Sequence, residues 1–319
     1  MRQPPRQHEI AVDEAAVTEV ARRYYLYDQS KVTIAAEMGL SRFQVARMLQ
    51  TARNLGIVRI EVGRAGRVDE SISEELAGHL GIRRAVVLTG LDGLPDDEIT
   101  DQIGRALSDV LTATVTAGET LGLSYSRQIA AMAGHVRQLP RCDVVQLAGH
   151  LLRATDAAGS PEIVRQVAAA SGGTSHPIYC PMLVADASVA TALRRQEEIA
   201  DALERGRAVD RAVVSIGAWA PGLSGIYQAV TAREQELGTA LGVCGEISGR
   251  LFDGDGRPVR DLLDERIIAL SLAEFRALPC VIGSCYGAER ADAARTAARS
   301  GLVDVLVTEA GLARRLLTS

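Results

Sequence analysis

The sequence predicts two folds in succession: a small helix-turn-helix unit of the winged type, then a Rossmann-like, mostly parallel α/β domain. Two short helical stretches with a tight corner between them occupy the front of the chain. From about residue 69, short β-branched runs alternate with alanine-rich helical stretches, which is the pattern of a parallel sheet covered on both faces. We therefore expect a lead-in at residues 1–10, the helical unit at 11–62, a linker at 63–68 and the α/β domain at 69–319.

Composition excludes several classes of protein. The 319 residues are 47% hydrophobic but only 3% aromatic, so we expect a core of Ala, Val, Leu and Ile. No apolar run approaches the ~20 residues that cross a bilayer, and the first ten residues lack the apolar centre of a signal peptide. The five cysteines are scattered and include no C-x-x-C pair, which fits reduced thiols. We therefore expect a cytoplasmic protein with no membrane partner.

The sequence also predicts no metal and no cofactor. Its five histidines do not lie at ligand spacing from one another or from a cysteine pair. Neither a G-x-G-x-x-G fingerprint after a strand nor a G-x-x-x-x-G-K-[ST] loop occurs, which argues against a nucleotide-binding dehydrogenase. Lys31 is the only lysine in the chain, so a Schiff-base lysine is excluded from the α/β domain.

The front unit is built around the stretch from Lys31 to Gln50. Apolar residues recur at helical spacing in "KVTIAAEM", and Gly39 follows where a corner needs a positive φ. Ser41 and Gln44 then form a capping box, S-x-x-Q, at the start of a second helix. This spacing is typical of helix-turn-helix units, although a plain corner of two helices inside an enzyme has the same pattern.

Charge distinguishes the front unit from the rest of the chain. Residues 1–66 carry ten Lys and Arg against seven Asp and Glu, whereas the remaining residues carry 25 against 33. A basic patch on an acidic protein is typical of nucleic-acid binding, with an ordinary solvated helix face as the alternative. We predict that the unit binds double-stranded operator DNA, with a strand at 57–63 and outward Arg59 as its wing. The candidate DNA-binding residues are Lys31, Ser41, Arg42, Gln44, Arg47 and Arg53.

The α/β domain is predicted from strands and helices that follow one another along the chain. The predicted strands are residues 85–89, 120–124, 143–147, 177–180, 211–217, 266–270, 280–285 and 304–308. The predicted helices include residues 97–114, 126–138, 161–170, 188–204 and 289–300.

Ligands of an open parallel sheet bind at the carboxyl ends of the strands, near helix N-termini. Three strand-to-helix turns, "GLSYSRQ", "QLAGHL" and "CYGAER", place hydroxyl, imidazole and guanidinium groups at such positions. A helix cap, a structural histidine and a surface arginine are the alternative interpretations. The candidate effector-binding residues from these turns are Gly122, Ser124, Ser126, Arg127, His150, Gly287 and Arg290.

The stretch "VCGEISGRLFDGDGRPV", residues 243–259, has a different composition. Its glycines and the sequence "DGDG" favour a tight turn between two strands. Glu246 and Asp253 are candidates for binding sugar hydroxyls, because a carboxylate can accept hydrogen bonds from two of them at once. A calcium loop is disfavoured, since the acidic spacing lacks the further ligands of an EF-hand.

Together these pieces resemble the SorC-type sugar-responsive transcriptional regulators. The resemblance runs from about residue 17 to the end, and its most specific part is "VIGSCYGAERADAARTAARSGLVDVLVTEAGLARRLL". It implies a second domain related to glucosamine-6-phosphate deaminase and ribose-5-phosphate isomerase. It also implies an effector sugar, often phosphorylated, and a homo-oligomer, either dimer or tetramer. By this resemblance Gln128, Gly149 and Tyr286 join the candidates for the effector pocket.

The sequence departs from the family loop, which commonly reads G-x-S-[WY]-G-R-T. Ser126 replaces the second glycine and Gln128 replaces the threonine. Two Gly-Gly pairs of the family read Gly-His at His150 and Tyr-Gly at Tyr286, and Arg290 replaces the usual lysine. Added side chains shrink the pocket, and the lost threonine hydroxyl removes a phosphate donor. We therefore hypothesise a small or unphosphorylated effector, such as a polyol or a short sugar.

Two functions from different classes follow. The first is a DNA-binding transcriptional regulator of carbohydrate or polyol metabolism genes, whose DNA affinity is controlled by a small sugar, polyol or sugar-phosphate effector. The alternative is a sugar-phosphate isomerase or deaminase, with Glu246, Asp253 and His150 as candidates for general acid–base catalysis. The front unit and the altered loop favour the regulator, so no catalytic residue is predicted.

Overall fold

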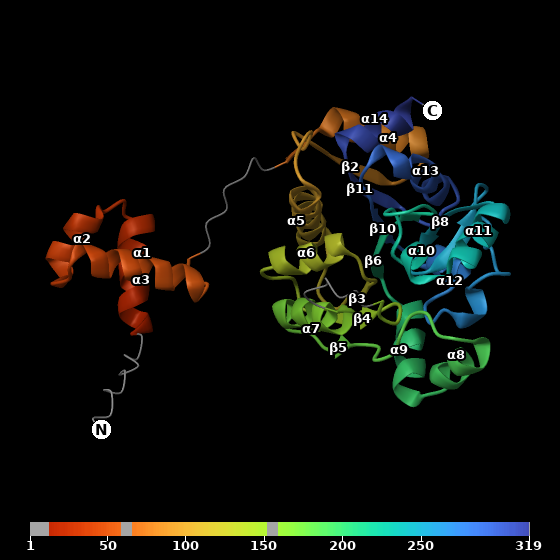
Figure 1. Cartoon of the computed structure of the whole chain (residues 1–319), viewed down its shortest axis with the longest axis horizontal. Helices are drawn as coiled ribbons and strands as arrows, with labels where there is room; N and C mark the ends of the chain where they lie inside the picture. Colours follow the sequence, from red (N-terminus) through yellow and green to blue (C-terminus); the bar gives the residue numbers. More distant parts are fainter. Residues whose placement is uncertain (1–12, 59–65, 152–158, 319) are drawn as a thin grey trace, which may run out of the picture. The chain divides into compact units, whose positions relative to one another are not determined.

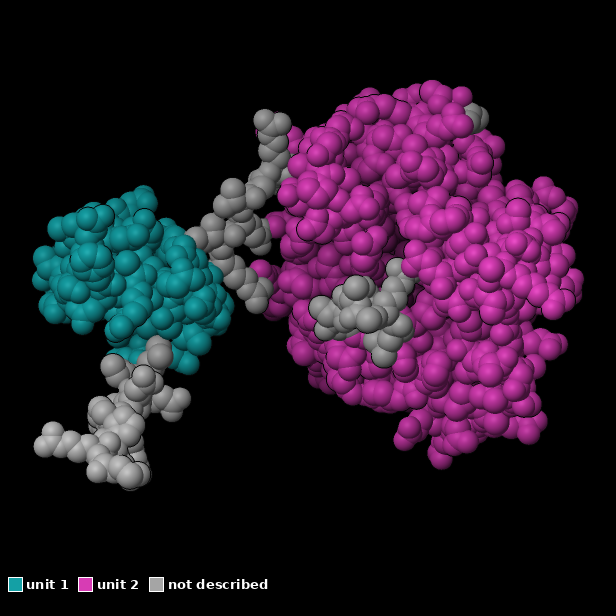
Figure 2. Space-filling model, in the orientation of Figure 1, with its two compact units in different colours: residues 1–64 teal, residues 65–319 magenta. Residues whose placement is uncertain are grey.

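The structure, a computed structural model, describes residues 13–58, 66–151 and 159–318. The chain divides into two compact units, residues 1–64 and 65–319, which are teal and magenta in Figure 2. This division falls inside the linker predicted at 63–68, but the last two residues of that linker form a strand instead. The predicted lead-in at 1–10 and most of the predicted wing strand, with Arg59, lie outside the described residues.

The first unit is a bundle of three packed helices, α1 (Glu14–Tyr25), α2 (Lys31–Met38) and α3 (Arg42–Asn54). Gly39 ends α2 with a φ of 66°, which the left-handed corner requires. The Ser41 hydroxyl accepts the N–H of Gln44 at 3.2 Å, and Gln44 Oε1 accepts the N–H of Ser41 at 2.7 Å. The predicted corner and capping box are therefore confirmed. The core of this unit consists of Val17, Val20, Ala21, Ile34, Ala35, Val45, Leu49 and Ala52.

The second unit is built on a twisted, mostly parallel sheet (Figure 1). Within the described residues its strand order is β1-β2-β11-β10-β6-β3-β4-β5, and every neighbouring pair is parallel except β1 with β2. Its strands are β1 (Arg67–Val68), β2 (Arg84–Thr89), β3 (Thr120–Leu123), β4 (Asp143–Gln146), β5 (Ser175–His176), β6 (Arg211–Ser215), β10 (Val281–Ser284) and β11 (Val305–Glu309).

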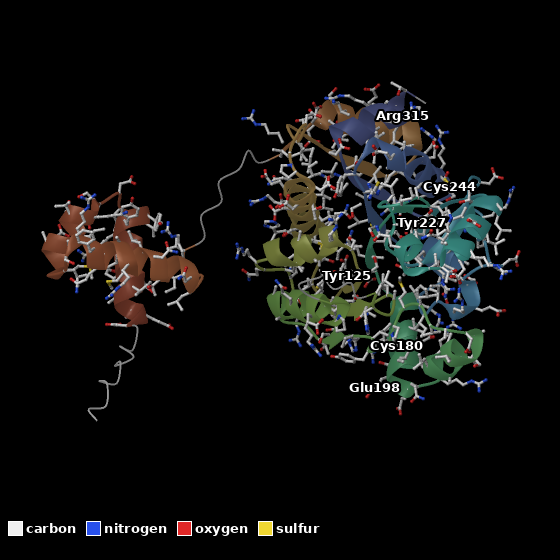
Figure 3. All side chains as sticks on the ribbon, viewed as in Figure 1. Tyr125, Cys180, Glu198, Tyr227, Cys244 and Arg315 are labelled. Carbon is white, nitrogen blue, oxygen red and sulfur yellow. The ribbon has the colours of Figure 1, made fainter. Side chains whose placement is uncertain are left out.

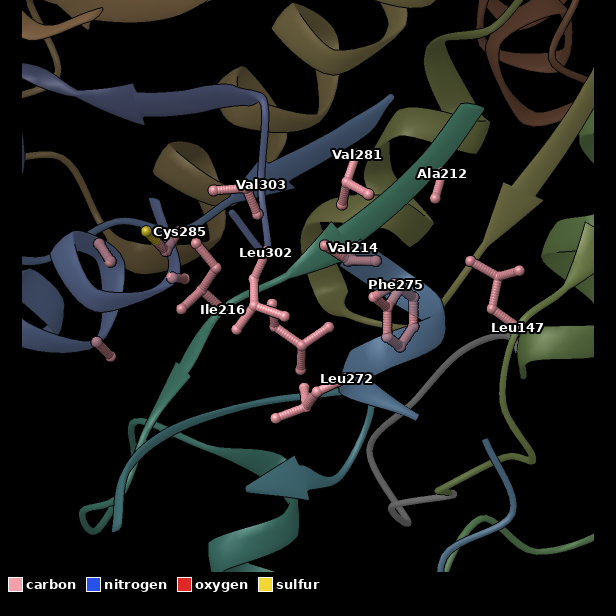
Figure 4. Close-up of a cluster of buried hydrophobic side chains, with 14 of the residues drawn as sticks. Leu147, Ala212, Val214, Ile216, Leu272, Phe275, Val281, Cys285, Leu302 and Val303 are labelled. Carbon is pink, nitrogen blue, oxygen red and sulfur yellow. The ribbon is translucent and has the colours of Figure 1, made fainter. Parts of the chain in front are cut away.

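Helices cover both faces of this sheet, because alternate strand residues point to opposite faces and both sets are apolar. On β2, Val86 and Leu88 belong to one core cluster, whereas Ala85 and Val87 belong to the other. Figure 4 shows part of the second cluster, including Phe275 and Val214. The first face is covered by α5 (Asp96–Thr114), α6 (Arg127–His135) and α7 (Ser160–Ser171), and the second by α4 (Glu70–Leu80), α9 (Glu197–Arg207), α12 (Leu272–Ala277), α13 (Ala291–Arg299) and α14 (Ala310–Leu317).

A small antiparallel sheet continues the main one beyond the carboxyl end of β6. It contains β7 (Gly217–Ala218), β8 (Val243–Ile247) and β9 (Arg250–Asp253) in that order. The chain turns tightly between β8 and β9 at residues 248–249, so the predicted hairpin exists, but "DGDG" at 253–256 is the next turn along the chain. The remaining elements are α8 (Ala187–Arg194), α10 (Gly225–Ala229), α11 (Ala232–Ala240), η1 (Asp264–Arg266) and η2 (Ala288–Arg290).

Two predicted strands and one predicted helix are wrong. The strand expected at 177–180 lies two residues earlier, as β5, and residues 266–270 form only isolated bridges at Ile267 and Ala269. Three carbonyls of residues 266–270 accept hydrogen bonds from the Arg250 guanidinium, at 3.2 Å for Ile267, 2.7 Å for Ala269 and 3.1 Å for Leu270. The helix expected at 188–204 is two helices, α8 and α9, because Gln196 is extended between them.

None of the helices in the described residues is both long and apolar enough to cross a membrane. The same residues include no group of three or more His, Cys, Asp or Glu side chains that could hold a metal ion.

Candidate functional site

The second unit contains a cavity of about 130 Å³ at the carboxyl ends of its central strands. Residues that follow β3, β4 and β10 line it, together with Ser215 at the end of β6 and Glu246 on β8. Tyr125, labelled in Figure 3, also lines it just before α6. This edge of a parallel sheet is where ligands bind in open α/β folds. The cavity is therefore the candidate ligand site of this unit.

Glu246 is the acidic centre of the cavity and only 8% exposed. Its Oε1 accepts the hydroxyl of Ser224 at 3.0 Å, and its Oε2 accepts the N–H of Gly249 at 2.9 Å. The β7–β8 register places it opposite Gly217, where an added Cβ would lie 2.4 Å from Oε1. Glycine at 217 thus leaves room for the carboxylate, a group that accepts hydrogen bonds from hydroxyl groups.

Ser248 is a cavity residue that sequence reasoning missed. It has a φ of 51°, which is uncommon for a residue with a side chain, and it lines the cavity at the tight turn between β8 and β9. Its hydroxyl is buried and has no hydrogen-bond partner within the described part of the chain. A buried, unpaired hydroxyl in a cavity is a natural donor or acceptor for a ligand. The sequence around Ser248 does not indicate this role, because both its φ angle and its burial depend on the hairpin register.

The predicted loop "GLSYSRQ" contributes its second half to the cavity. Ser126, Arg127 and Gln128 line it, and Ser126 also caps α6 by accepting the N–H of Ile129 at 3.2 Å. Gly122 does not line it, because this glycine serves packing within β3: an added Cβ would lie 2.6 Å from the Leu147 side chain. Ser124 does not line it either, since its hydroxyl faces β6 and donates to the carbonyl of Val213 at 3.3 Å.

The turn after β4 is split in the same way. Gly149 lines the cavity, and an added Cβ there would lie 2.6 Å from the carbonyl oxygen of Pro181. His150 does not line it, and its Nδ1 is buried with no hydrogen-bond partner in the described residues.

The turn after β10 places Tyr286 and Arg290 in the cavity. The Tyr286 hydroxyl hydrogen-bonds the hydroxyl of Thr100 on α5 at 3.1 Å, and Arg290 donates to the Tyr286 carbonyl at 2.6 Å. Gly287 does not line the cavity: with a φ of 89° it forms the bend itself, and its N–H donates to Glu309.

Asp253 does not line the cavity either. Its Oδ1 accepts the N–H groups of Asp255 and Arg257, at 2.9 and 2.8 Å, and so closes the turn that follows β9. Of the three groups considered for acid–base catalysis, the structure therefore brings Glu246 alone to the cavity wall. Other polar residues of the wall that the sequence did not single out are Thr100, Ser215 and Ser224.

Four of the five cysteines, Cys142, Cys180, Cys280 and Cys285, are buried, and Cys244 is half-buried. Burial raises the pKa of Cys285, which follows β10, to about 12, and that of Cys180 to about 11. Both groups therefore remain protonated thiols near neutral pH and are poor nucleophiles.

The predicted DNA-binding residues of the first unit lie on α2, at the cap of α3 and along α3. Arg42 and Arg47 on α3 are exposed, and neither has an ion-pair or hydrogen-bond partner within the described residues. Arg53 donates to Gln50 at 2.7 Å, and the Lys31 ammonium lies 5.4 Å from the centre of the Tyr24 ring. Ser41 and Gln44 are committed to the capping box, so the free cations of α3 are those of Arg42 and Arg47.

Comparison with known proteins connects both units to transcription. A family described as "putative sugar-binding domain" matches residues 68–318. The transcriptional regulator LsrR of Klebsiella pneumoniae subsp. pneumoniae is 26% identical over 312 residues, covering 96% of this chain and 93% of that protein. The sorbitol operon regulator of Klebsiella pneumoniae is 23% identical over 310 residues, covering 96% and 98%. The crystal structure of the full-length sorbitol operon regulator SorC from Klebsiella pneumoniae superposes with a TM-score of 0.73 at 22% identity, covering 96% of this chain and 99% of that one.

Proposed function

Since the chain belongs to the SorC-type sugar-responsive transcriptional regulators, with the family's putative sugar-binding domain over residues 68–318, we propose that its first unit binds operator DNA under the control of a ligand bound in its second unit. The observation that carries the proposal is the division of chemistry between the units. One presents the unpaired arginines of α3, and the other encloses a polar cavity at the carboxyl ends of a parallel sheet.

The effector that fits this cavity best is a small, unphosphorylated sugar or polyol. Glu246 places a buried carboxylate in the wall, and a carboxylate accepts hydroxyl groups. It also repels a phosphate, against the attraction of Arg127 and Arg290 in the same wall. Ser126 and Gln128 stand in the wall where the related loop has a glycine and a threonine. Isothermal titration with matched free and phosphorylated sugars tests the choice. Tight binding of only the phosphorylated member of a pair would contradict it.

A regulator is favoured over a sugar-phosphate isomerase or deaminase. Such an enzyme needs a general acid and a general base within hydrogen-bond reach of the substrate. His150 and Asp253 do not line the cavity with Glu246, which leaves that pair incomplete among the residues predicted for it. Turnover of a sugar phosphate by the purified protein would favour the enzyme.

The operator geometry follows from pairing of subunits. A homodimer, alone or within a tetramer, would place two recognition helices about 34 Å apart, or at multiples of that distance, on one face of the duplex. The operator would then be a pseudo-palindrome. The protein would bind it in the cytoplasm. Light scattering of the protein with and without operator DNA measures the number of subunits bound.

Replacing Arg47 by Ala tests the DNA-binding face. Its guanidinium is free to contact a base edge or a phosphate, so we expect operator affinity to fall by about 1–3 kcal/mol and effector affinity to stay unchanged. Arg141→Ala is the matched control, because it removes the same charge from an exposed position of the second unit. Operator titration at two salt concentrations distinguishes a base contact of Arg47 from a phosphate contact. Losing a phosphate contact makes operator affinity depend less steeply on salt concentration. Unchanged operator affinity in Arg47→Ala would rule out α3 as the recognition helix.

Replacing Glu246 by Gln tests the cavity. The carboxylate has two acceptor oxygens, which accept from Ser224 and Gly249, whereas the amide of glutamine has one oxygen and brings an NH₂ donor to the wall. We expect the effector to lose its influence on operator binding while operator affinity without effector stays near normal. Asp253→Asn is the control, because Asp253 lies in the same stretch of sequence but outside the cavity wall. An effector response that survives in Glu246→Gln would show that the site has been misplaced.

A further inference from the structure

Phe43 has an unusual environment for an aromatic side chain. It is the second residue of α3 and is 87% exposed, more than any other large apolar side chain in the described residues. An aromatic ring left in water forgoes roughly 1.5–3 kcal/mol of stabilisation that burial would give. Its own unit does not use this ring, because the core is filled from the opposite face of α3 by Val45, Leu49 and Ala52.

The neighbours of Phe43 are cations. Arg42 precedes it, and Arg47 lies one turn further along the helix on the same side, since residues four apart are neighbours on a helix surface. Gln44 is held at the cap, where its Oε1 accepts the N–H of Ser41. The first turn of α3 therefore presents one apolar ring between two free guanidinium groups. This chemistry fits a polyanion that also offers apolar groups.

We propose that Phe43 is a specificity-determining residue that contacts the C5-methyl group of a thymine in the major groove. The inference rests on the proposed function, because it requires α3 to be a recognition helix. The first residues of such a helix contact base edges, and thymine is the base whose major-groove edge carries a methyl group that Phe can contact. The arginines on either side bind phosphates or guanines and hold the ring in the groove.

The test uses the full chain and DNA selected from a random pool by the protein itself. Each thymine of the selected site is then replaced by deoxyuridine, which removes only the methyl group. We expect one thymine in each half-site at which this replacement weakens binding about fourfold, the value for one buried methyl group. Phe43→Ala should bind the thymine site more weakly and should not distinguish thymine from deoxyuridine there. Phe43→Leu, which keeps an apolar side chain, should retain part of the discrimination.

Leu26→Ala is the matched control, since Leu26 is a 68% exposed apolar residue of the same unit that is not on α3. It should leave the thymine preference unchanged. Because both side chains are exposed, neither replacement should unfold the unit, and circular dichroism verifies this.

The possible failures are distinguishable. If the full chain selects no DNA sequence, both the proposed function and this inference are overturned. If the chain binds a defined site but tolerates deoxyuridine at every position, or if Phe43→Ala keeps the same methyl dependence, the inference alone is overturned. A change in the number of subunits without a change in thymine preference would make Phe43 a contact between copies, and would overturn it as well.

Discussion

At the scale of single residues, Glu246 and Asp253 show what a sequence can and cannot indicate. Both are acidic residues in one glycine-rich stretch, and both were candidates for binding hydroxyl groups. The hairpin register turns Glu246 into the cavity and leaves Asp253 to close a turn outside it. Composition does not separate the two carboxylates, whereas the pairing of β8 with β9 does.

Ser248 allows the sharpest test of the cavity, because its conformation and its hydroxyl can be removed separately. Ser248→Ala deletes the unpaired hydroxyl, whereas Ser248→Gly also relieves the left-handed backbone at a φ of 51°. Both variants should bind the effector more weakly, by about 0.5–1.5 kcal/mol for one hydrogen bond. Both variants should also be more stable without effector, because each removes a buried, unpaired hydroxyl. The glycine variant should be the more stable of the two, by up to about 1 kcal/mol, because glycine adopts a positive φ without steric cost. Effector titration and urea unfolding measure the two effects.

The outcomes for Ser248 are independent of each other. Equal effector affinity in wild type and both variants would remove Ser248 from the binding site. Ser188→Ala serves as the control, because Ser188 is exposed on α8 and is not part of the cavity wall. Ser188→Ala should change neither the effector affinity nor the free energy of unfolding relative to wild type.

At the scale of elements, most of the fold could be predicted because local signals agreed with it. The capping box began α3 as expected, and the six other predicted strands each overlap a strand of the structure. The region 266–270 failed because a short β-branched run also suits an extended segment without a strand partner. Here the carbonyls of Ile267, Ala269 and Leu270 accept from the side chain of Arg250, and that of Ile268 accepts from the N–H of Gly149. No periodicity in 266–270 itself encodes that.

Arg250 should therefore be required for stability. It is 6% exposed, and it donates to the carbonyls of Leu270, Ile267 and Ala269 and to the carboxylate of Asp264 at 2.8 Å. Arg250→Ala would remove the donor from the buried carbonyls of Leu270 and Ala269 and the ion-pair partner from Asp264, and we expect a loss of about 3–5 kcal/mol. Lysine should not restore it, since an ammonium lacks the planar fork of donors.

Urea unfolding followed by the fluorescence of Trp219 measures this loss in the second unit alone, because Trp219 is the only tryptophan. Arg257→Ala is the control: Arg257 lies on the next turn and pairs with exposed Asp255. A cost of less than about 1 kcal/mol for Arg250→Ala, the median worth of a surface pair, would contradict the role given to Arg250.

At the scale of the whole molecule, the described residues form separate cores in the two units. In the second unit, ion pairs link elements that are distant in the sequence. Glu119 before β3 pairs with Arg211 on β6, Glu234 on α11 with Arg266 on η1, and Glu274 on α12 with Arg207 on α9. Burial pushes the pKa of each carboxyl group upward. Hydrogen bonds from the paired arginine and from Thr116, Thr231 or Ser271 outweigh it, so all three pKa values lie below the ordinary value.

These pairs predict that acid destabilises the second unit. A carboxyl group whose pKa is lower in the folded than in the unfolded chain stabilises the fold fully above the unfolded pKa, about 4.3 for Glu, and this contribution is lost as pH falls through the folded pKa. We therefore expect the free energy of unfolding, followed by Trp219 fluorescence, to fall steadily below about pH 5.

Glu119→Gln should be less stable than wild type at pH 7, and the difference should shrink with acidification, because protonation removes the same charge from the wild type. Glu198→Gln, which changes an exposed glutamate on α9 (Figure 3), should show no such pH-dependent difference. A gap between Glu119→Gln and wild type that stays constant from pH 7 down to the acid transition would mean that the Glu119–Arg211 pair contributes geometry but no charge-dependent stability.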